Sequence, residues 1–151
     1  MKTTYILLTL VAGAFTACHP GAQQSTVSTD TVITSPIHIR NACYTKIIGR
    51  DTIQLTLNVE DSVATGNLSY NFFEKDKNTG KISGLLHNDI LRAQYNYYSE
   101  GVESSRPVIF KLTDKTAFEA MPEKIDDQGI PVFSANNQEL KFDTIPFHRC
   151  D

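Results

Sequence analysis

The feature that most constrains the fold of this chain is a polar–apolar alternation with a period of two residues. It is clearest at 51–60, DTIQLTLNVE, where aliphatic side chains alternate with Thr, Gln and Asn. Side chains along a β-strand point alternately to the two faces of a sheet, so this segment predicts a strand that is buried on one face only. No apolar period of 3.6 residues runs long enough to predict a helix.

The same alternation recurs along the rest of the chain. We expect further strands at 43–48, 68–72, 81–86, 91–97, 108–112, 116–121, 130–134 and 140–145. Turn-rich segments separate them, among them 74–80, where Gly80 is expected at positive φ, and we expect Gly66 to mark a bulge. Short strands with hairpin-length connections predict an all-β domain over 37–151, an antiparallel meander closed as a small β-barrel that is lipocalin-like in style, with a β-sandwich as the alternative.

The N-terminus has the pattern of a secretion signal. Lys2 precedes an apolar run at 6–14, ILLTLVAGA, which is too short to span a bilayer. The following Phe15-Thr16-Ala17-Cys18 resembles the lipobox of bacterial lipoproteins, although Phe15 stands where Leu is usual. The resemblance implies that a lipoprotein signal peptide, 1–17, is removed and that Cys18 is diacylated. Several acyl chains hold a soluble domain on a membrane essentially permanently.

Residues 18–36 predict a flexible tether, because they contain seven Ser or Thr and almost no charge. His19 follows the anchor in place of the Asp that is associated with retention in the inner membrane. We therefore expect lipid anchoring to the outer membrane, with the domain facing the periplasm. Asp30-Thr31-Val32 resembles the O-glycosylation signal of Bacteroidetes envelope proteins, which makes Thr31 a candidate glycosylation site.

The two remaining cysteines flank the patterned region. In an oxidising compartment the simplest pairing joins Cys43 to Cys150 once Cys18 is acylated. A disulfide requires Cα atoms within about 7 Å of each other. The pairing therefore predicts that the first and last strands are neighbours, which favours a closed barrel over an open sheet.

A longer resemblance lies in the middle of the chain. Residues 66–112 contain Gly-x-Leu-x-Tyr, a Glu-Lys-Asp turn, and Ser-Glu-Gly ahead of an Arg-containing strand. This pattern resembles an uncharacterised family of Bacteroidetes envelope lipoproteins, which implies an envelope location and brings no activity with it. The meander of short strands is also similar in style to lysozyme-inhibitor barrels, but a shared architecture does not imply a shared function.

The sequence argues against several classes of function. The 14 basic residues are scattered among 17 acidic ones, for a net charge of −3, so strong nucleic-acid binding is not expected. The four histidines have no metal-ligand spacing, and neither a nucleophile elbow nor a phosphate-binding loop is present. We expect no metal site and no cofactor, and we expect that the protein is not an enzyme.

Aromatic side chains share one face of the expected strands. Two interpretations remain open: the rings fill the core of a small barrel, or they line an apolar cavity whose tyrosine hydroxyls orient a ligand. Tyr98 is expected on the opposite face. The possible ligand-lining residues are Tyr70, Phe72, Tyr95, Tyr97 and Phe110.

The densest polar stretch, 99–106, contains two acids and an arginine. We expect Glu100 or Glu103 to pair with Arg106 at the entrance of a strand. The leading functional hypothesis is a non-enzymatic binding module of the cell envelope that recognises an unknown envelope protein or glycan through 74–80 and 99–106. The alternatives are a carrier of a small apolar ligand inside the barrel and a lysozyme-inhibitor-like protein.

Overall fold

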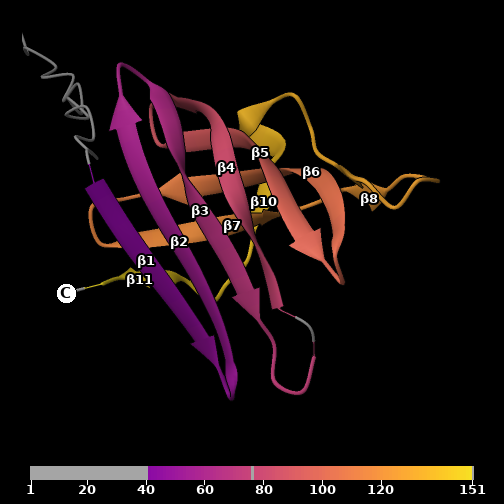
Figure 1. The fold of residues 1–151 in the computed structure, drawn as a ribbon. Coiled ribbons are helices and arrows are strands. Elements are labelled where there is room, and N and C mark those ends of the chain that lie inside the picture. Colours follow the sequence, from indigo (N-terminus) through magenta and orange to yellow (C-terminus); the bar gives the residue numbers. More distant parts are fainter. Residues whose placement is uncertain (1–40, 76, 151) are drawn as a thin grey trace, which may run out of the picture. The chain divides into compact units, whose positions relative to one another are not determined.

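The computed structural model describes residues 41–75 and 77–150 (Figure 1). Regular structure in these residues is β-strand, apart from one short 3-10 helix, η1 (Asn137–Glu139). The predictions made for residues 1–40, including the lipidation of Cys18 and the glycosylation of Thr31, lie outside the described residues. The strands are β1 (Asn41–Ile48), β2 (Asp51–Glu60), β3 (Val63–Asn71), β4 (Lys77–His87), β5 (Ile90–Ser99), β6 (Val102–Leu112), β7 (Thr116–Met121), β8 (Lys124–Ile125), β9 (Pro131–Val132), β10 (Lys141–Phe142) and β11 (Phe147–Arg149).

The strands form a closed antiparallel barrel, as the alternation predicts. Strands β1 to β6 pair in sequence order, β6 pairs with β7, β7 with β11, and β11 with β1. The two short strands β10 and β11 pair with β7 at successive positions along it. This eight-stranded meander confirms the barrel and not the β-sandwich. Strands β2 and β7 have the bounds that the sequence predicts.

The first and last strands meet where the barrel closes, and β1 lies beside β11 in Figure 1. The predicted disulfide joins Cys43 to Cys150 with 5.2 Å between their Cα atoms. The amide of Cys150 also donates a hydrogen bond of 2.8 Å to the carbonyl of Cys43. The sequence did not predict β11, because a three-residue segment, Phe147–Arg149, is too short to show an alternation.

The prediction that Gly80 takes a positive φ in a 74–80 loop is wrong. Strand β4 already begins at Lys77, and the left-handed backbone in this turn belongs to Glu74, with φ of 56°. Gly80 lies within the ladder opposite Tyr97, where a Cβ atom would lie 1.9 Å from the carbonyl oxygen of Asn96. The close approach of the neighbouring backbone therefore requires glycine at this position.

Gly66 is likewise not a bulge. It pairs in regular register with Leu57 of β2, and a Cβ atom would lie 1.8 Å from the carbonyl oxygen of Thr56. A glycine in a strand marks either a bulge or a close backbone approach. The alternation alone does not distinguish these two cases, and the structure shows the second.

Two apolar clusters stabilise the domain. The larger cluster fills the barrel and includes the inward side chains of β1 to β7 and Phe147 of β11. The smaller one lies on the outer face of β5, β6 and β7, where residues 124–142 cover it; its members are Ile90, Ile109 and Ala120, packed against Phe133, Leu140 and Phe142. Arg92 holds this covering segment in place, because it donates hydrogen bonds to the Ser134 carbonyl at 2.7 Å and to Asn137 Oδ1 at 2.8 Å.

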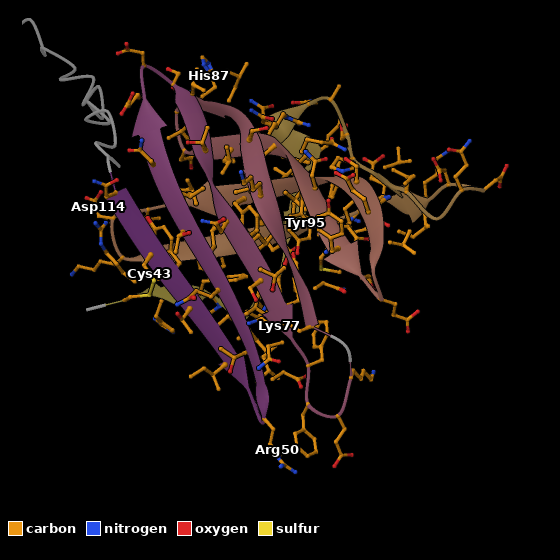
Figure 2. The ribbon with its side chains drawn as sticks, viewed as in Figure 1. Cys43, Arg50, Lys77, His87, Tyr95 and Asp114 are labelled. Atoms are coloured by element: carbon orange, nitrogen blue, oxygen red, sulfur yellow. A yellow bond between two sulfur atoms is a disulfide. The ribbon has the colours of Figure 1, made fainter. Side chains whose placement is uncertain are left out.

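The meander places alternate turns at opposite ends of the barrel. The β1–β2, β3–β4 and β5–β6 turns share one end, which we call the tyrosine end; the β2–β3, β4–β5 and β6–β7 turns share the other. In Figure 2, Arg50 and Lys77 mark the tyrosine end, and His87 and Asp114 mark the opposite end. Both segments that the sequence singles out for partner binding have their turns at the tyrosine end.

Candidate functional site

The aromatic side chains predicted as ligand-lining all lie on the inward face. Tyr70, Tyr95 and Phe110 are buried, and Phe72 and Tyr97 are partly buried against the same core. The rings of Tyr70 and Tyr95 have centroids 5.9 Å apart, and those of Tyr95 and Tyr97 stack at 4.7 Å. Four of the rings therefore gather toward the tyrosine end. Their role in binding a ligand stays a prediction.

Two aromatic residues lie apart from this group. Phe110 packs deeper in the barrel against Phe147, with ring centroids 5.7 Å apart in an edge-to-face arrangement. Tyr98 lies on the outer face of β5 with 60% of its surface exposed, as the alternation predicts. The period of two thus assigns each ring to the correct face.

Arg106 lies inside this group of rings. It faces Tyr95 across the β5–β6 ladder. Its guanidinium carbon lies 5.1 Å from the ring centroid of Tyr70, 5.8 Å from that of Tyr95 and 5.9 Å from that of Tyr97. These distances are in the range of cation–π attraction, so three tyrosine rings stabilise one positive charge.

The predicted ion pair of Arg106 with Glu100 or Glu103 is wrong. Glu103 lies opposite the outward-facing Tyr98, whereas Arg106 is three residues further along the strand and faces inward. Glu100 lies in the β5–β6 turn, with φ of 51°. Residues separated by an odd number along a strand point to opposite faces, which is why proximity in the sequence gave the wrong partner.

A carboxylate also lies inside the barrel. Glu119 of β7 faces Phe110, and its Oε1 accepts a hydrogen bond of 2.5 Å from the Tyr70 hydroxyl. Burial raises the pKa of Glu119 above its ordinary value, while the hydrogen bond from Tyr70 and the charge of Arg106 act in the opposite direction. Burial and the nearby Glu119 raise the pKa of Tyr70 well above its ordinary value.

An ion pair lies near Glu119. Lys46 of β1 is only 3% exposed, and its Nζ forms an ion pair with Oδ2 of Asp143, which follows β10. The hydrogen bond from Lys46 is the main cause of a lowered pKa at Asp143. The Lys46 Nζ also lies 5.4 Å from the ring centroid of Phe147.

Glu119 and Lys46 are interior residues that we did not predict from the sequence. The signal was present, because both occupy inward positions of alternating strands: Glu119 lies two residues after Ala117, and Lys46 two after Tyr44. A charged residue at an apolar position of the alternation marks a buried polar group that needs a partner.

Three buried polar side-chain atoms have no hydrogen-bond partner in the part of the chain that the structure describes. They are the hydroxyl of Tyr95, Nε of Arg106 and Oδ1 of Asn78. Asn78 lies opposite Tyr70 in the β3–β4 ladder, so all three atoms belong to the same end of the barrel. We call the group the tyrosine–arginine cluster: Tyr70, Asn78, Tyr95, Tyr97, Arg106 and Glu119.

The three unpartnered atoms lie at one end of the barrel and are candidates for binding a further group. More than nine in ten buried polar groups of folded proteins have a hydrogen-bond partner. Three buried atoms without one at the same end of the barrel therefore require an explanation. A water molecule or a ligand group that reaches the cluster would satisfy them. The available hydrogen-bonding groups are a guanidinium N–H donor, a hydroxyl and an amide oxygen, and they lie among aromatic rings.

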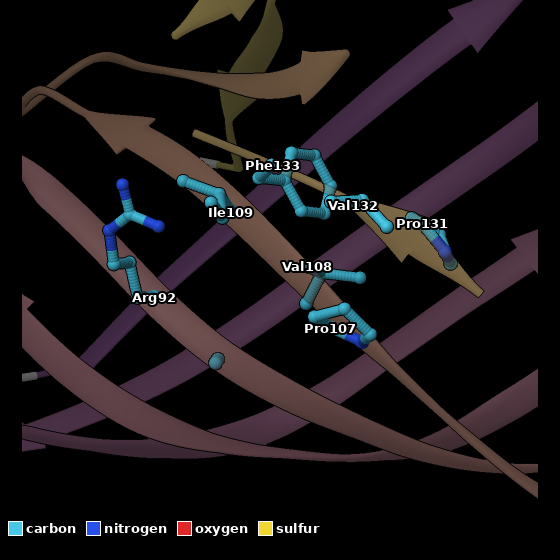
Figure 3. Close-up of a pocket in the computed structure, with 8 residues that line it drawn as sticks. Arg92, Pro107, Val108, Ile109, Pro131, Val132 and Phe133 are labelled. Atoms are coloured by element: carbon cyan, nitrogen blue, oxygen red, sulfur yellow. The ribbon is translucent and has the colours of Figure 1, made fainter. Parts of the chain in front are cut away.

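Grooves on the outside of the barrel are lined by other residues. One groove of about 310 Å³ lies between β5, β6 and β9 (Figure 3), and its lining is Arg92, Ala93, Pro107, Val108, Ile109, Pro131, Val132 and Phe133. A second, of about 420 Å³, lies near Met121 and Leu140. No residue of the tyrosine–arginine cluster lines either groove.

Exposed apolar side chains gather at the tyrosine end. Ile47 and Ile48 end strand β1, Phe73 lies in the β3–β4 connection, and Tyr98 and Val102 flank the β5–β6 turn. Met121, at the end of β7, adds a sixth. We call these six residues the apolar rim. Val63 and Leu85, which are paired across β3 and β4, form a smaller exposed patch at the opposite end.

Two structural features are absent from residues 41–75 and 77–150. No helix there is long and apolar enough to cross a membrane. No group of three or more His, Cys, Asp or Glu side chains there is placed to hold a metal ion.

Comparison with known proteins finds no family model, no curated protein and no solved structure that matches this chain. A functional assignment therefore depends on the residues and geometry described above.

Proposed function

We propose that this protein is a lipid-anchored, non-enzymatic binding module of the bacterial cell envelope that recognises an envelope protein through the tyrosine end of its barrel. The lipobox ending at Cys18 supports the anchor. The disulfide between Cys43 and Cys150 supports an oxidising compartment such as the periplasm. The absence of any nucleophile or phosphate-loop motif from the sequence supports a binding role over a catalytic one.

The observation that carries the proposal is the apolar rim. Ile47, Tyr98 and Val102 have 68%, 60% and 63% of their surface exposed. Single exposed apolar residues are common, whereas several at one end of a domain are typical of an interaction surface. Aliphatic side chains in the rim, among them Ile48 and Met121, favour a protein partner over a glycan.

The test compares two double variants of the full-length protein in capture from envelope extract. Ile48→Ser with Val102→Ser removes apolar surface from the rim, and Val63→Ser with Leu85→Ser removes similar surface from the opposite end. We expect the rim variant to recover about tenfold less partner, because a few apolar anchors carry most of the binding energy of an interface. Equal recovery by the two variants would contradict the proposal.

A carrier of a small apolar ligand is the second candidate. The inward tyrosine rings favour it, but they pack against one another and surround a charged guanidinium. The two grooves described above open on the outside of the barrel. Native mass spectrometry of the purified protein tests this candidate, since a carrier would retain a bound apolar molecule.

A further inference from the structure

We propose that the tyrosine–arginine cluster binds a carboxylate group that enters from the tyrosine end. The inference rests on the proposed function, because it names the chemical group that this end of the barrel recognises. It depends on different atoms: the apolar rim carries the proposed function, and the unpartnered polar atoms inside the barrel carry the choice of a carboxylate.

Arg106 is the primary ligand-binding group. A guanidinium presents its N–H donors in a planar fork that matches the two oxygens of a carboxylate. The Nε of Arg106 is buried without a hydrogen-bond partner, and the residues that the structure describes offer the guanidinium no ion pair. Three tyrosine rings hold the group in position, so its fork is ordered before any ligand arrives.

Tyr95 and Asn78 complete the site. The Tyr95 side chain is fully buried, and its hydroxyl lacks a partner, so it is free to donate to an oxygen of the incoming group. The Oδ1 of Asn78 is a buried acceptor without a donor. A ligand that carries an O–H or N–H beside its carboxylate, as a hydroxy acid or a peptide does, would satisfy all three atoms.

The charges nearby favour a carboxylate over a phosphate. Arg106 is the only cation among the six residues of the cluster, and the nearby Lys46 is already paired with Asp143. Glu119 lies close enough for its ionisation to be influenced by the charge of Arg106. A doubly charged phosphate would meet stronger repulsion from Glu119 than a carboxylate, which brings a single negative charge and fits the guanidinium plane.

Part of the cluster is exposed to solvent. Arg106 and Tyr97 are partly exposed, while Tyr95 and Nε of Arg106 are buried beneath them. A carboxylate on a free small molecule or on the terminus of a partner polypeptide would present the same chemistry here. The experiment therefore has an arm for each source.

The experiment follows the side-chain Nε–Hε resonances of arginine by NMR in the full-length protein in detergent micelles. One arm adds sodium lactate. The other adds a tetrapeptide with a free terminal carboxylate and, separately, the same peptide as its terminal amide. We expect the Arg106 resonance to shift with lactate, with the carboxylate peptide or with both, and not with the amide.

Three variants separate binding from structure. Arg106→Lys keeps the charge but removes the planar fork, and Tyr95→Phe removes only a hydroxyl that has no partner in the protein. We expect each to weaken carboxylate binding at least tenfold, while Tyr95→Phe leaves the melting temperature unchanged. Tyr98→Phe, on the outer face of the same strand, is the matched control and should bind like the wild type.

The outcomes are distinct. A shift with lactate supports a free carboxylate as the source, and a shift with the peptide alone supports a partner terminus. An unmoved Arg106 resonance, or equal binding of the amide, overturns the inference. In capture from envelope extract, loss of partner in the rim variant together with full recovery by Arg106→Lys would overturn a partner terminus as the source of the carboxylate and leave the proposed function standing.

Discussion

The hydroxyl of Tyr70 donates a hydrogen bond of 2.5 Å to Oε1 of Glu119, although the two residues are 49 positions apart in the sequence. The bond crosses the barrel interior from β3 to β7. It supplies a strong donor to a carboxylate that has left water, and hydrogen bonds to charged groups are roughly twice as strong as neutral ones. The interior of this barrel therefore contains a polar contact within its apolar core.

Removing the donor should destabilise the fold. We expect Tyr70→Phe to lower the free energy of unfolding by about 1.5 kcal/mol, because the half-buried Glu119 loses its hydrogen-bond donor. Urea denaturation measures the change. Tyr98→Phe removes an exposed hydroxyl and should shift the free energy by less than about 0.5 kcal/mol. A Tyr70→Phe effect as small as that of the control would contradict this account of the hydrogen bond.

The pH dependence of stability should reflect Glu119. Burial raises its pKa above the ordinary 4.5, so the native protein binds this proton more tightly than the unfolded chain does. The stabilisation is complete below the ordinary pKa and is lost as the pH rises through the pKa of the folded state. We therefore expect the melting temperature of Glu119→Gln, relative to that of the wild type, to increase between about pH 4 and about pH 8.

The control for this measurement is a variant of Asp143, one of the groups around Glu119. Tyr70, Arg106, Lys46 and Asp143 all influence its ionisation. Asp143 has a lowered pKa, so its contribution is present above its ordinary pKa and is lost as the pH falls. Asp143→Asn should thus differ most from the wild type at the higher pH values, where it is the less stable protein. A constant difference between Glu119→Gln and the wild type would refute the assignment.

Loss of Asp143 should destabilise the fold mainly because Lys46, the buried member of the ion pair, is left without a partner. Lys46 is 3% exposed and Asp143 36%, so removing Asp143 leaves an unpaired ammonium inside the barrel. We expect Asp143→Ala to lower the free energy of unfolding by about 2 kcal/mol. Adding Lys46→Met to this variant should restore part of the loss, because the unpaired charge is gone. A double variant less stable than Asp143→Ala would show that the unpaired charge of Lys46 does not cause the loss of stability.

The disulfide should contribute more than any single hydrogen bond. Cys43 and Cys150 are 107 positions apart, so the bond restricts most of the unfolded domain. Replacing both by Ser should lower the free energy of unfolding by about 2–5 kcal/mol, measured by urea denaturation. The β1–β11 pairing remains, so the variant should keep the far-ultraviolet circular dichroism of the barrel at low temperature. An unchanged unfolding midpoint would contradict this role.

The architecture could be predicted because its causes are local or covalent. The alternation assigns faces to strands, and the cysteine pair predicts that the first and last strands are neighbours. The features that could not be predicted depend on contacts between residues that are far apart in the sequence. Proximity in the sequence predicts that Arg106 pairs with Glu100 or Glu103, whereas the ladder places it opposite Tyr95 among residues from β3 and β5.

The candidate site shows the same division. Tyr70 and Tyr95 were predicted as inward, and the structure places them there. Glu119 and Lys46 were missed, because each is a single charge in an otherwise apolar set, and its partner lies on a distant strand. The orphaned hydroxyl of Tyr95 is visible only once all neighbours are in place.

The measurement that tests the central claim most directly is photo-crosslinking in living cells. A photo-crosslinking amino acid replaces Val102 in the apolar rim or, as the matched control, the equally exposed Leu85 at the opposite end. Recognition through the tyrosine end predicts a discrete adduct with an envelope protein from position 102 and none from position 85. An adduct from position 85 alone, or no adduct from either position, would contradict the account.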